Sequence, residues 1–548
     1  MSVVPLRQAG PSVTGRRPGP GRLVVLFTAH QVRRGWLIVV ALPAGMSAVV
    51  VGTYRAVVAD ELDAANLRAL AANPAIRVLF GEPVALDSPG GFAVWRTGTP
   101  LAVLLSVWAL LAATRLTRGD EDAGRLDLLL AGRLTVVELT LRRTATLVAA
   151  TMSVGMAVAV ALLAAGTAVP GALVHGAGLG LTGAFFAVTG SLAAQVLPTR
   201  AAATGAAAGV LGAALMLRSL GDGLPELDAV RWLSPFGLLS LSRPYADDNV
   251  MPLFLLLLGC AGAVVGTAAA ARRRDLRGAL IGGSARRRPQ TALLGSMTRF
   301  AVRRLWRVGL GWAVGVAAYF ALIGALSVSL TDFLRDNPRF ADLAAQAGFA
   351  RLHTVEGYLA SLFLLLAVPV GVFVAVRFSA LAADEGARRL DLLLAAPVTR
   401  RRLVAAEIVV TLAAAALLLL VAAAAAWTGA SAAGASVALA DAAAGTANVL
   451  PVVLLCLGAS VVALGWTPRA VVAVGSLPAV GGFLLDVIVQ STGLPSWIGQ
   501  PSPFVHLAAV PDAPVNWTAS AVMVVVALVT TAVGARRYDR RDRLAAAA

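Results

Sequence analysis

The sequence contains no lysine, because all of its 46 basic residues are arginines. A phosphate-binding loop of the Walker A type needs a lysine that reaches the β and γ phosphates of a nucleotide. The chain therefore cannot carry such a loop. If ATP drives a process in which this chain takes part, another polypeptide hydrolyses that ATP.

Cysteine and charge are also scarce. The only two cysteines, Cys260 and Cys456, lie in separate apolar runs, which indicates neither a disulfide framework nor a metal site. Charged residues make up 14% of the chain and hydrophobic residues 58%, with a mean hydropathy of +0.80. This composition is typical of a polytopic membrane protein. The net charge of +17 comes largely from short arginine clusters beside apolar runs, so we expect orientation signals and no nucleic-acid partner.

Apolar runs long enough to cross a bilayer recur along both halves of the chain. The first half has six: Trp36–Thr53, Thr99–Thr114, Thr144–Ala168, Gly171–Val196, Ala201–Leu217 and Met251–Ala271. The second half has six more: Val308–Val328, Leu359–Val376, Val404–Trp427, Asn448–Leu464, Ala470–Val489 and Thr518–Ala535. We therefore predict an all-α polytopic membrane protein with about twelve transmembrane helices.

Arginine is unevenly shared between the loops on the two sides of these spans. Most arginines fall on one side if the N-terminus is inside, which places both termini in the cytoplasm of a bacterial plasma membrane protein. The segment before the first span has apolar residues on one side and suits a helix in the membrane interface. The expected domains are a disordered tail at 1–21, six-span halves at 22–271 and 308–535, a basic linker with an interfacial helix at 272–307, and a tail at 536–548.

One stretch occurs twice, from Asp120 to Leu139 and from Asp384 to Leu403. Ten of the first twelve positions match at an offset of 264. Ser234-Pro235-Phe236 also recurs as Ser502-Pro503-Phe504, and an Asn-Pro pair recurs at 73–74 and 337–338. Since each half has an even number of spans, the halves are predicted to be parallel repeats.

The repeated stretch reads as an amphipathic helix at the membrane surface. On a helix, Leu126, Leu129 and Leu130 form an apolar stripe. Acids at 120–122 suit the first turn of this helix, and Glu121 and Arg125 are spaced to pair four residues apart. The corresponding residues of the second copy are Glu385, Arg389, Leu390, Leu393 and Leu394.

A capping box is expected to open the helix that follows the first copy. Thr135 and Glu138 have the required spacing, with the hydroxyl and the carboxylate each accepting a backbone N–H. The second copy has Arg402 at the position of the acid, so we expect it to have lost the box. The helices of the repeated stretch should end near Gly132 and before Pro397.

The motif E-x-x-x-R-L-D-L-L-L-A after the second span resembles the cytoplasmic coupling element of type-2 ABC exporter permeases. The twelve-span tandem form resembles actinobacterial polyketide-antibiotic (tetronasin-type) exporter permeases. The resemblance implies a separate ABC ATPase, two copies of it holding ATP and Mg²⁺, with no cofactor, metal or catalytic residue on this chain. It also implies that the coupling residues are Glu121, Arg125, Leu126, Asp127, Leu129, Leu130, Glu385, Arg389, Leu390, Asp391, Leu393 and Leu394.

The repeated Ser-Pro-Phe motif lies just before the last span of each half, with a tryptophan upstream. Tryptophan favours the membrane interface and proline breaks a helix, so each motif predicts a short re-entrant or interfacial helix on the outer side. Type-2 exporters, which the chain resembles, have such elements above the translocation path. The residues concerned are Trp232, Ser234, Pro235, Phe236, Trp497, Ser502, Pro503 and Phe504.

Export of a lipophilic or amphipathic, drug-like compound is the function that these features indicate, and two other classes stay open. A proton-coupled drug antiporter needs ionisable groups inside the membrane, and we identify only Asp486 within a span. A membrane-embedded transferase needs clustered acids or histidines at one interface. The outer acids Glu61, Asp63, Glu82 and Asp87 are instead scattered along a loop.

Overall fold

The computed structural model describes residues 19–57, 77, 81–132, 134–223, 225–274, 278–281, 295–336, 354–395, 398–492 and 495–545. All secondary structure in these segments is helical. The chain forms two compact units, residues 1–72 with 77–285, and residues 73–76 with 286–548. The Asn-Pro pairs, Glu61, Asp63, Arg133 and Pro397 lie outside the described residues.

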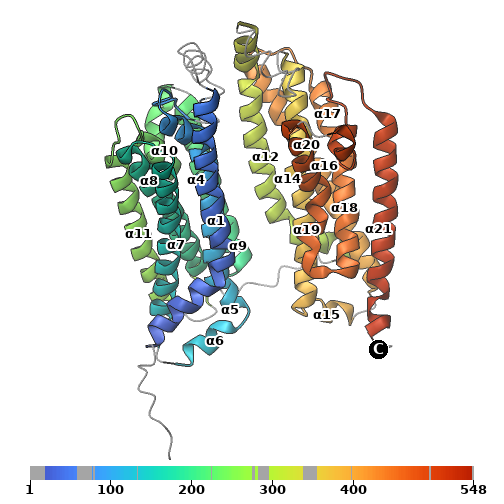
Figure 1. Cartoon of the computed structure of the whole chain (residues 1–548). Coiled ribbons are helices and arrows are strands. Elements are labelled where there is room, and N and C mark those ends of the chain that lie inside the picture. Colours follow the sequence, from blue (N-terminus) through green and yellow to red (C-terminus); the bar gives the residue numbers. More distant parts are fainter. Residues whose placement is uncertain are drawn as a thin grey trace, which may run out of the picture. The chain divides into compact units, whose positions relative to one another are not determined.

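The first half contains six long helices joined by short helical segments (Figure 1). The long helices are α1 (Pro20–Val57), α4 (Pro89–Thr114), α7 (Val136–Ala164), α8 (Val169–Val196), α9 (Arg200–Gly223) and α11 (Met251–Arg273). The short segments are η1 (Arg115–Gly119), α5 (Asp120–Asp122), α6 (Arg125–Leu130), η2 (Pro225–Leu233) and α10 (Pro235–Leu241).

The second half repeats this order with more interruptions near its C-terminal end. Its longer helices are α12 (Met297–Asp336), α14 (Val355–Gly386), α16 (Arg400–Ala432), α17 (Leu439–Ala447), α18 (Leu450–Trp466), α20 (Gly482–Thr492) and α21 (Trp517–Ala545). The short segments are α15 (Asp391–Leu394), η4 (Pro468–Ala470), α19 (Val471–Ser476), η5 (Leu477–Gly481), η6 (Ser496–Ile498) and η7 (Pro503–His506).

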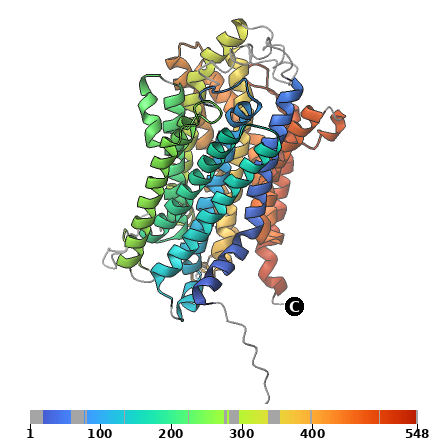
Figure 2. The ribbon, with the colours of Figure 1, turned by 60° about the vertical axis from the view of Figure 1, so that its left-hand side comes forward.

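Twelve helical stretches in the described residues are long and apolar enough to cross a membrane, six in each half, which confirms the predicted number. Figures 1 and 2 show the long helices of each half running alongside one another. In the described residues, no separate interfacial helix precedes the first or the seventh span, because α1 and α12 each continue without a break into the span. Their 38 and 40 residues exceed the roughly 20 that cross the hydrocarbon layer.

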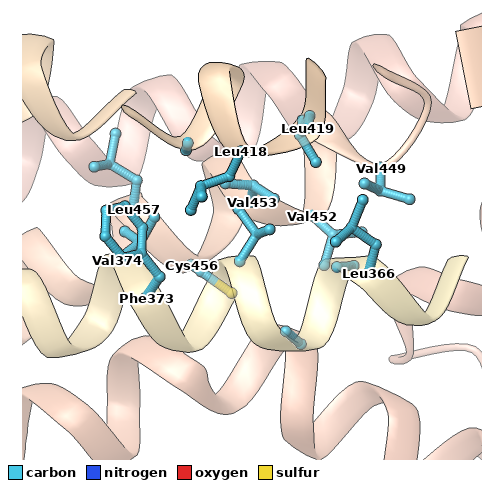
Figure 3. Packing of buried hydrophobic residues seen from close by; sticks show 14 of the residues in the cluster. Leu366, Phe373, Val374, Leu418, Leu419, Val449, Val452, Val453, Cys456 and Leu457 are labelled. Atoms are coloured by element: carbon cyan, nitrogen blue, oxygen red, sulfur yellow. The ribbon is translucent and has the colours of Figure 1, made fainter. Parts of the chain in front are cut away.

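Each half packs around its own apolar core. In the second half, Phe373 of α14 and Leu418 of α16 lie among Val452, Val453 and Cys456 of α18 (Figure 3). In the first half, Leu105 of α4 and Phe186 of α8 are fully buried in the corresponding core. The outward faces of the helices carry exposed leucine and valine, as expected for surfaces that meet lipid.

Candidate functional site

The acids of the repeated stretch lie at the end of the span that precedes it. Helix α4 continues through the π-helical turn η1 into α5, so Asp120 and Glu121 sit at the C-terminal end of a helix. In the second half, α14 likewise runs through Asp384 and Glu385 to Gly386. The expectation that these acids open a helix is therefore wrong. A carboxylate is disfavoured at a helix C-terminus, so these acids need nearby cations.

A residue in the left-handed conformation interrupts each copy. Gly124 has a φ of +70° and Arg388, at the same offset of 264, has a φ of +55°. The interruption ends the helix before the Arg125 position, so the spacing of four residues no longer brings side chains together. The predicted Glu121–Arg125 and Glu385–Arg389 pairs are not formed.

The arginine after each break pairs with the aspartate five residues earlier. The Nη2 of Arg125 lies 2.7 Å from Asp120 Oδ1, and the Nη1 of Arg389 lies 3.3 Å from Asp384 Oδ1. Because both arginine side chains are more than half exposed, these pairs contribute about 1 kcal/mol or less to stability. The two copies nevertheless share the same geometry at this point.

In the first half, Glu121 belongs to a buried cluster. Its Oε1 and Oε2 accept hydrogen bonds of 2.7 and 2.8 Å from Arg274, which follows α11. The Nε of Arg274 donates to the side-chain oxygen of Gln195 in α8 at 2.7 Å. Arg118 Nη1 lies 3.3 Å from Glu121, and its guanidinium also donates to the Pro198 carbonyl. Such charge-assisted, bidentate contacts fix geometry as well as charge.

Asp120 connects the same element to α7. Its Oδ2 lies 2.9 Å from Arg143 Nη2, and both side chains are nearly inaccessible. Arg143 also donates to the Leu116 carbonyl in the π-helical turn. The first repeated stretch is therefore attached to α7, α8 and the end of α11. We call the side chains of Arg118, Asp120, Glu121, Arg143 and Arg274 the first charge cluster.

The second half has a cluster built from other partners. Arg304 of α12 contacts Asp384 and lies 2.6 Å from Glu407 of α16. The other oxygen of Glu407 accepts a 2.7 Å hydrogen bond from Arg377 of α14. Glu407 is 1% exposed, so its charge is held by two arginines in a dry environment. We call Arg304, Arg377, Asp384 and Glu407 the second charge cluster.

Glu385 pairs with Arg400 at the start of α16. The guanidinium of Arg400 lies 5.3 Å from the ring centre of Tyr538 in α21. A cation over an aromatic face at this distance is attracted by the ring. In the first half, the repeated glutamate is bound by Arg274, the residue that follows the last span. In the second half, it is linked to the last span through Arg400.

The predicted apolar stripe faces the protein's own helices. Leu126 is 5% exposed and packs with Val24 of α1 and Leu139 of α7, and Leu129 and Leu130 are partly buried against this group. In the second copy, Leu390 is buried and Leu393 partly buried in the core, while the side chain of Leu394 lies outside the described set. Between the stripe positions, Leu128 is 80% exposed.

The expected capping box is present in the first copy. Thr135 caps α7 and Glu138 accepts a hydrogen bond from the Thr135 backbone N–H, while the Thr135 hydroxyl accepts from the Glu138 N–H. In the second copy, Thr399 accepts from the Arg402 N–H at 3.3 Å, without the reciprocal carboxylate. The predicted loss of the box is confirmed.

The two Ser-Pro-Phe motifs share one hydrogen bond to a distant backbone carbonyl. Ser234 and Ser502 each donate to a backbone carbonyl twenty residues earlier, at 2.6 Å to Ala214 and 2.8 Å to Gly482. Both serines are buried, and each is followed by a short helix that begins at the proline. The phenylalanine rings of the two motifs, Phe236 and Phe504, are each buried in the core of their own half. The upstream tryptophans, Trp232 and Trp497, are exposed.

An ion network supports the first of these motifs. Arg231, just before the motif, lies 3.1 Å from Glu82 and 3.2 Å from Asp222 of α9. Asp222 in turn lies 2.5 Å from Arg218. Burial lowers the pKa of Arg231, but the hydrogen bond to Glu82 and the charge of Asp222 outweigh burial and hold the pKa above its usual value. Glu82 therefore has a structural partner, which argues against its being part of a catalytic cluster.

Sequence reasoning missed the residues that hold the repeated acids. Arg274 is 153 positions from Glu121, and no local pattern connects them. The sequence alone could have drawn attention to Arg143 and Glu407. They occupy corresponding positions of the two copies, 264 residues apart, and carry opposite charges. Glu407 also corrects the statement that Asp486 is the one acid within a span, because Glu407 lies inside the ninth predicted span.

These features define a multi-pass helical membrane protein of two similar halves, each with a charged element at the end of its second span. Residues 294–538 match the family model described as "Multidrug efflux system permease Rv1217c, C-terminal domain". The chain is also 30% identical over 375 residues to the multidrug efflux system permease protein Rv1217c of Mycobacterium tuberculosis. That alignment covers 66% of this chain and spans 65% of the length of the relative.

Proposed function

We propose that this chain is the membrane-spanning permease subunit of an ATP-driven exporter, with ATP hydrolysis in a separate ABC ATPase. The observation that carries the proposal is the repeated charged element, whose acids are held to the neighbouring helices by ion pairs that are buried in the first half and partly buried in the second. An element attached in this way can pass a push from outside the membrane to the helices. The similarity to a multidrug efflux permease supports the outward direction of transport.

The surface offered to the ATPase consists of side chains that the protein does not itself cover. In the first half these belong to α6, where Leu128 is 80% exposed and the Arg125 side chain 58% exposed. In the second half, the Arg389 side chain is 66% exposed and Asp391 is exposed. The buried leucines of the stripe hold each element to the membrane domain rather than to the partner.

We infer that the exported compounds are lipophilic or amphipathic. The spans are rich in alanine, valine, leucine and glycine, and the buried acids Asp222 and Glu407 within them are paired with arginines. A path with such walls suits compounds that partition into the bilayer. Transport of more than one drug agrees with the name of the relative, a multidrug efflux system permease protein.

A proton-coupled antiporter is the second candidate, because acids do lie within spans. Glu407 is held on both carboxylate oxygens by arginines, Arg304 at 2.6 Å and Arg377 at 2.7 Å. Asp486 in α20 has a contact of its own and is partly exposed. The absence of a free buried carboxylate at Glu407 therefore favours the ATP-driven alternative.

Co-purification with a tagged ABC ATPase tests the proposal. We expect the wild-type chain to retain the ATPase, and a Leu128→Arg, Arg389→Glu double variant to lose most of it, because both docking surfaces are altered. Leu233→Arg, a change at an equally exposed leucine in η2, should retain binding. Full retention by the double variant would show that these elements are not the docking sites.

A further inference from the structure

The first charge cluster also holds the beginning of the linker that follows the first half. The carbonyl oxygen of Gly278 accepts a 2.9 Å hydrogen bond from Arg118 Nη1 and a 3.3 Å bond from Arg274 Nη1. These are the two arginines that hold Glu121. One carboxylate and one linker carbonyl thus share the same pair of guanidinium groups.

A second attachment lies three residues further on. The backbone N–H of Ile281 donates a 3.0 Å hydrogen bond to the carbonyl of Val196, at the end of α8. We call residues 278–281 the linker start. Its side chains are not used in this attachment, since Leu280 is 44% exposed and Ile281 is 62% exposed. The linker start is therefore fixed by its backbone, while its side chains stay accessible.

Burial makes this attachment strong. The side chains of Arg118, Glu121 and Arg274 are each only 2 to 3% exposed. Removing one partner from such a buried set leaves an uncompensated charge, so the set is expected to move as a unit rather than separate. In the second half, Glu385 contacts Arg400, which lies against Tyr538 of α21.

We call the first copy of the repeated stretch, Asp120 to Leu139, the first coupling element, and the second copy the second coupling element. We propose that Arg118 and Arg274 are positioning residues that fasten the linker start to the first coupling element, so that the linker start follows this element through the transport cycle. The proposal rests on the proposed function, because the ATPase supplies the movement. It makes the two coupling elements unequal: a movement of the first reaches the linker between the halves, and a movement of the second is passed to α21. The linker start then becomes a point at which binding or cleavage regulates the first half alone.

State-dependent labelling tests this inference in inside-out vesicles that contain the chain and its ATPase. The probe is a small soluble maleimide, and the reporter is Ile281→Cys. The native Cys260 and Cys456 are buried, so they add little background. We expect the labelling rate of Ile281→Cys to differ between the nucleotide-free state and the state trapped with ATP and vanadate.

Weakening the attachment should reduce that difference. Arg274→Ala removes one of the two hydrogen bonds to the Gly278 carbonyl and both bonds to Glu121, so the labelling rates of Ile281→Cys in the two states should come closer together. Arg273→Ala, which removes the same charge from the exposed preceding position, should keep the difference. If Arg274→Ala reduces the amount of folded protein, Arg274→Lys provides the test. It keeps the charge beside Glu121 but cannot form the fork that serves Glu121, Gln195 and Gly278 together, so the difference between states should shrink.

A second reporter, Leu128→Cys on α6, separates the two hypotheses. If Leu128→Cys responds to trapping and Ile281→Cys does not, the linker start does not follow the element and the inference is wrong. An undiminished Ile281→Cys response in Arg274→Ala contradicts it equally. If neither reporter responds and the ATPase does not bind, the proposed function fails, and this inference fails with it.

Discussion

The two halves repeat the same acids but neutralise them differently. Asp120 is held by Arg143 of α7, whereas the residue at the repeat offset from Arg143 is Glu407, which itself needs Arg304 and Arg377. Asp384 is therefore held by Arg304 of α12. The comparison shows that duplication kept the acid at the end of the span and let the source of positive charge change. What is required at this position is compensation of a buried carboxylate at a helix C-terminus.

The Ser-Pro-Phe motifs differ from the charge clusters, because here the two halves share the same contact. Ser234 and Ser502 make the same hydrogen bond to a carbonyl twenty residues earlier. A buried hydroxyl that donates to one particular helix carbonyl has no simple substitute, whereas a positive charge can come from several neighbouring helices. The two halves kept the same contact where only one side chain can make it. They differ where several arginines can neutralise the same acid.

The largest expected effects come from exchanging the charges at the diverged position. Arg143→Glu places a second buried acid beside Asp120, and Glu407→Arg places a third cation beside Arg304 and Arg377. Each should destabilise its half by at least about 3 to 5 kcal/mol, the usual cost of breaking a buried pair. The amount of monodisperse protein in detergent and its thermal midpoint measure this. Arg142→Glu, at the less buried preceding position, should be much milder. If Arg142→Glu lowered the stability as much as Arg143→Glu and Glu407→Arg do, the buried ion pairs would not be the cause of the loss.

The next largest effects should be equal in the two halves. Ser234→Ala and Ser502→Ala each remove a buried hydroxyl and its hydrogen bond to a helix carbonyl, at a cost of about 1.5 kcal/mol. Thermal unfolding of the two single variants should show shifts of similar size. A large shift in one half and none in the other would contradict the claim that the two motifs are equivalent.

A smaller effect of opposite sign is expected at the left-handed positions. Arg388→Gly should stabilise the second half by about 1 kcal/mol, because the left-handed conformation costs a residue with a Cβ about 1 to 2 kcal/mol. Gly124→Ala should destabilise the first half by a similar amount, since no atom crowds a Cβ there and only the backbone strain counts. Thermal midpoints that move in the same direction would contradict this assignment of conformation.

The smallest effect comes from restoring the missing capping box. Arg402→Glu supplies the carboxylate that Glu138 supplies in the first copy, and should stabilise α16 by about 0.5 kcal/mol. Glu138→Arg should have the reverse effect on α7. Hydrogen exchange of the first turn of each helix measures both. Faster exchange in Arg402→Glu would mean that Arg402 contributes more than the box would.

The sequence was sufficient for features that depend on local pattern. The number of spans, the Thr135 capping box and the short helices that begin at Pro235 and Pro503 follow from hydrophobic patterning and from cap and proline signals. The partner of Glu121 was not predictable, because the left-handed Gly124 removes the local pairing and Arg274, which follows α11, replaces it. The sequence also did not show that α1 is one continuous helix. Polarity changes where the expected interfacial helix meets the span, but the backbone hydrogen bonds of the helix continue across this boundary.

The energy source is the most direct test of the central claim. Cells expressing the chain with its ATPase would be loaded with a lipophilic dye, and efflux would be measured after ATP depletion and, separately, with an uncoupler. The account predicts that efflux stops when ATP is depleted and that Asp486→Asn retains most of it, since an amide of the same shape still forms hydrogen bonds. Efflux that survives ATP depletion, but stops with the uncoupler and in Asp486→Asn, would contradict the account.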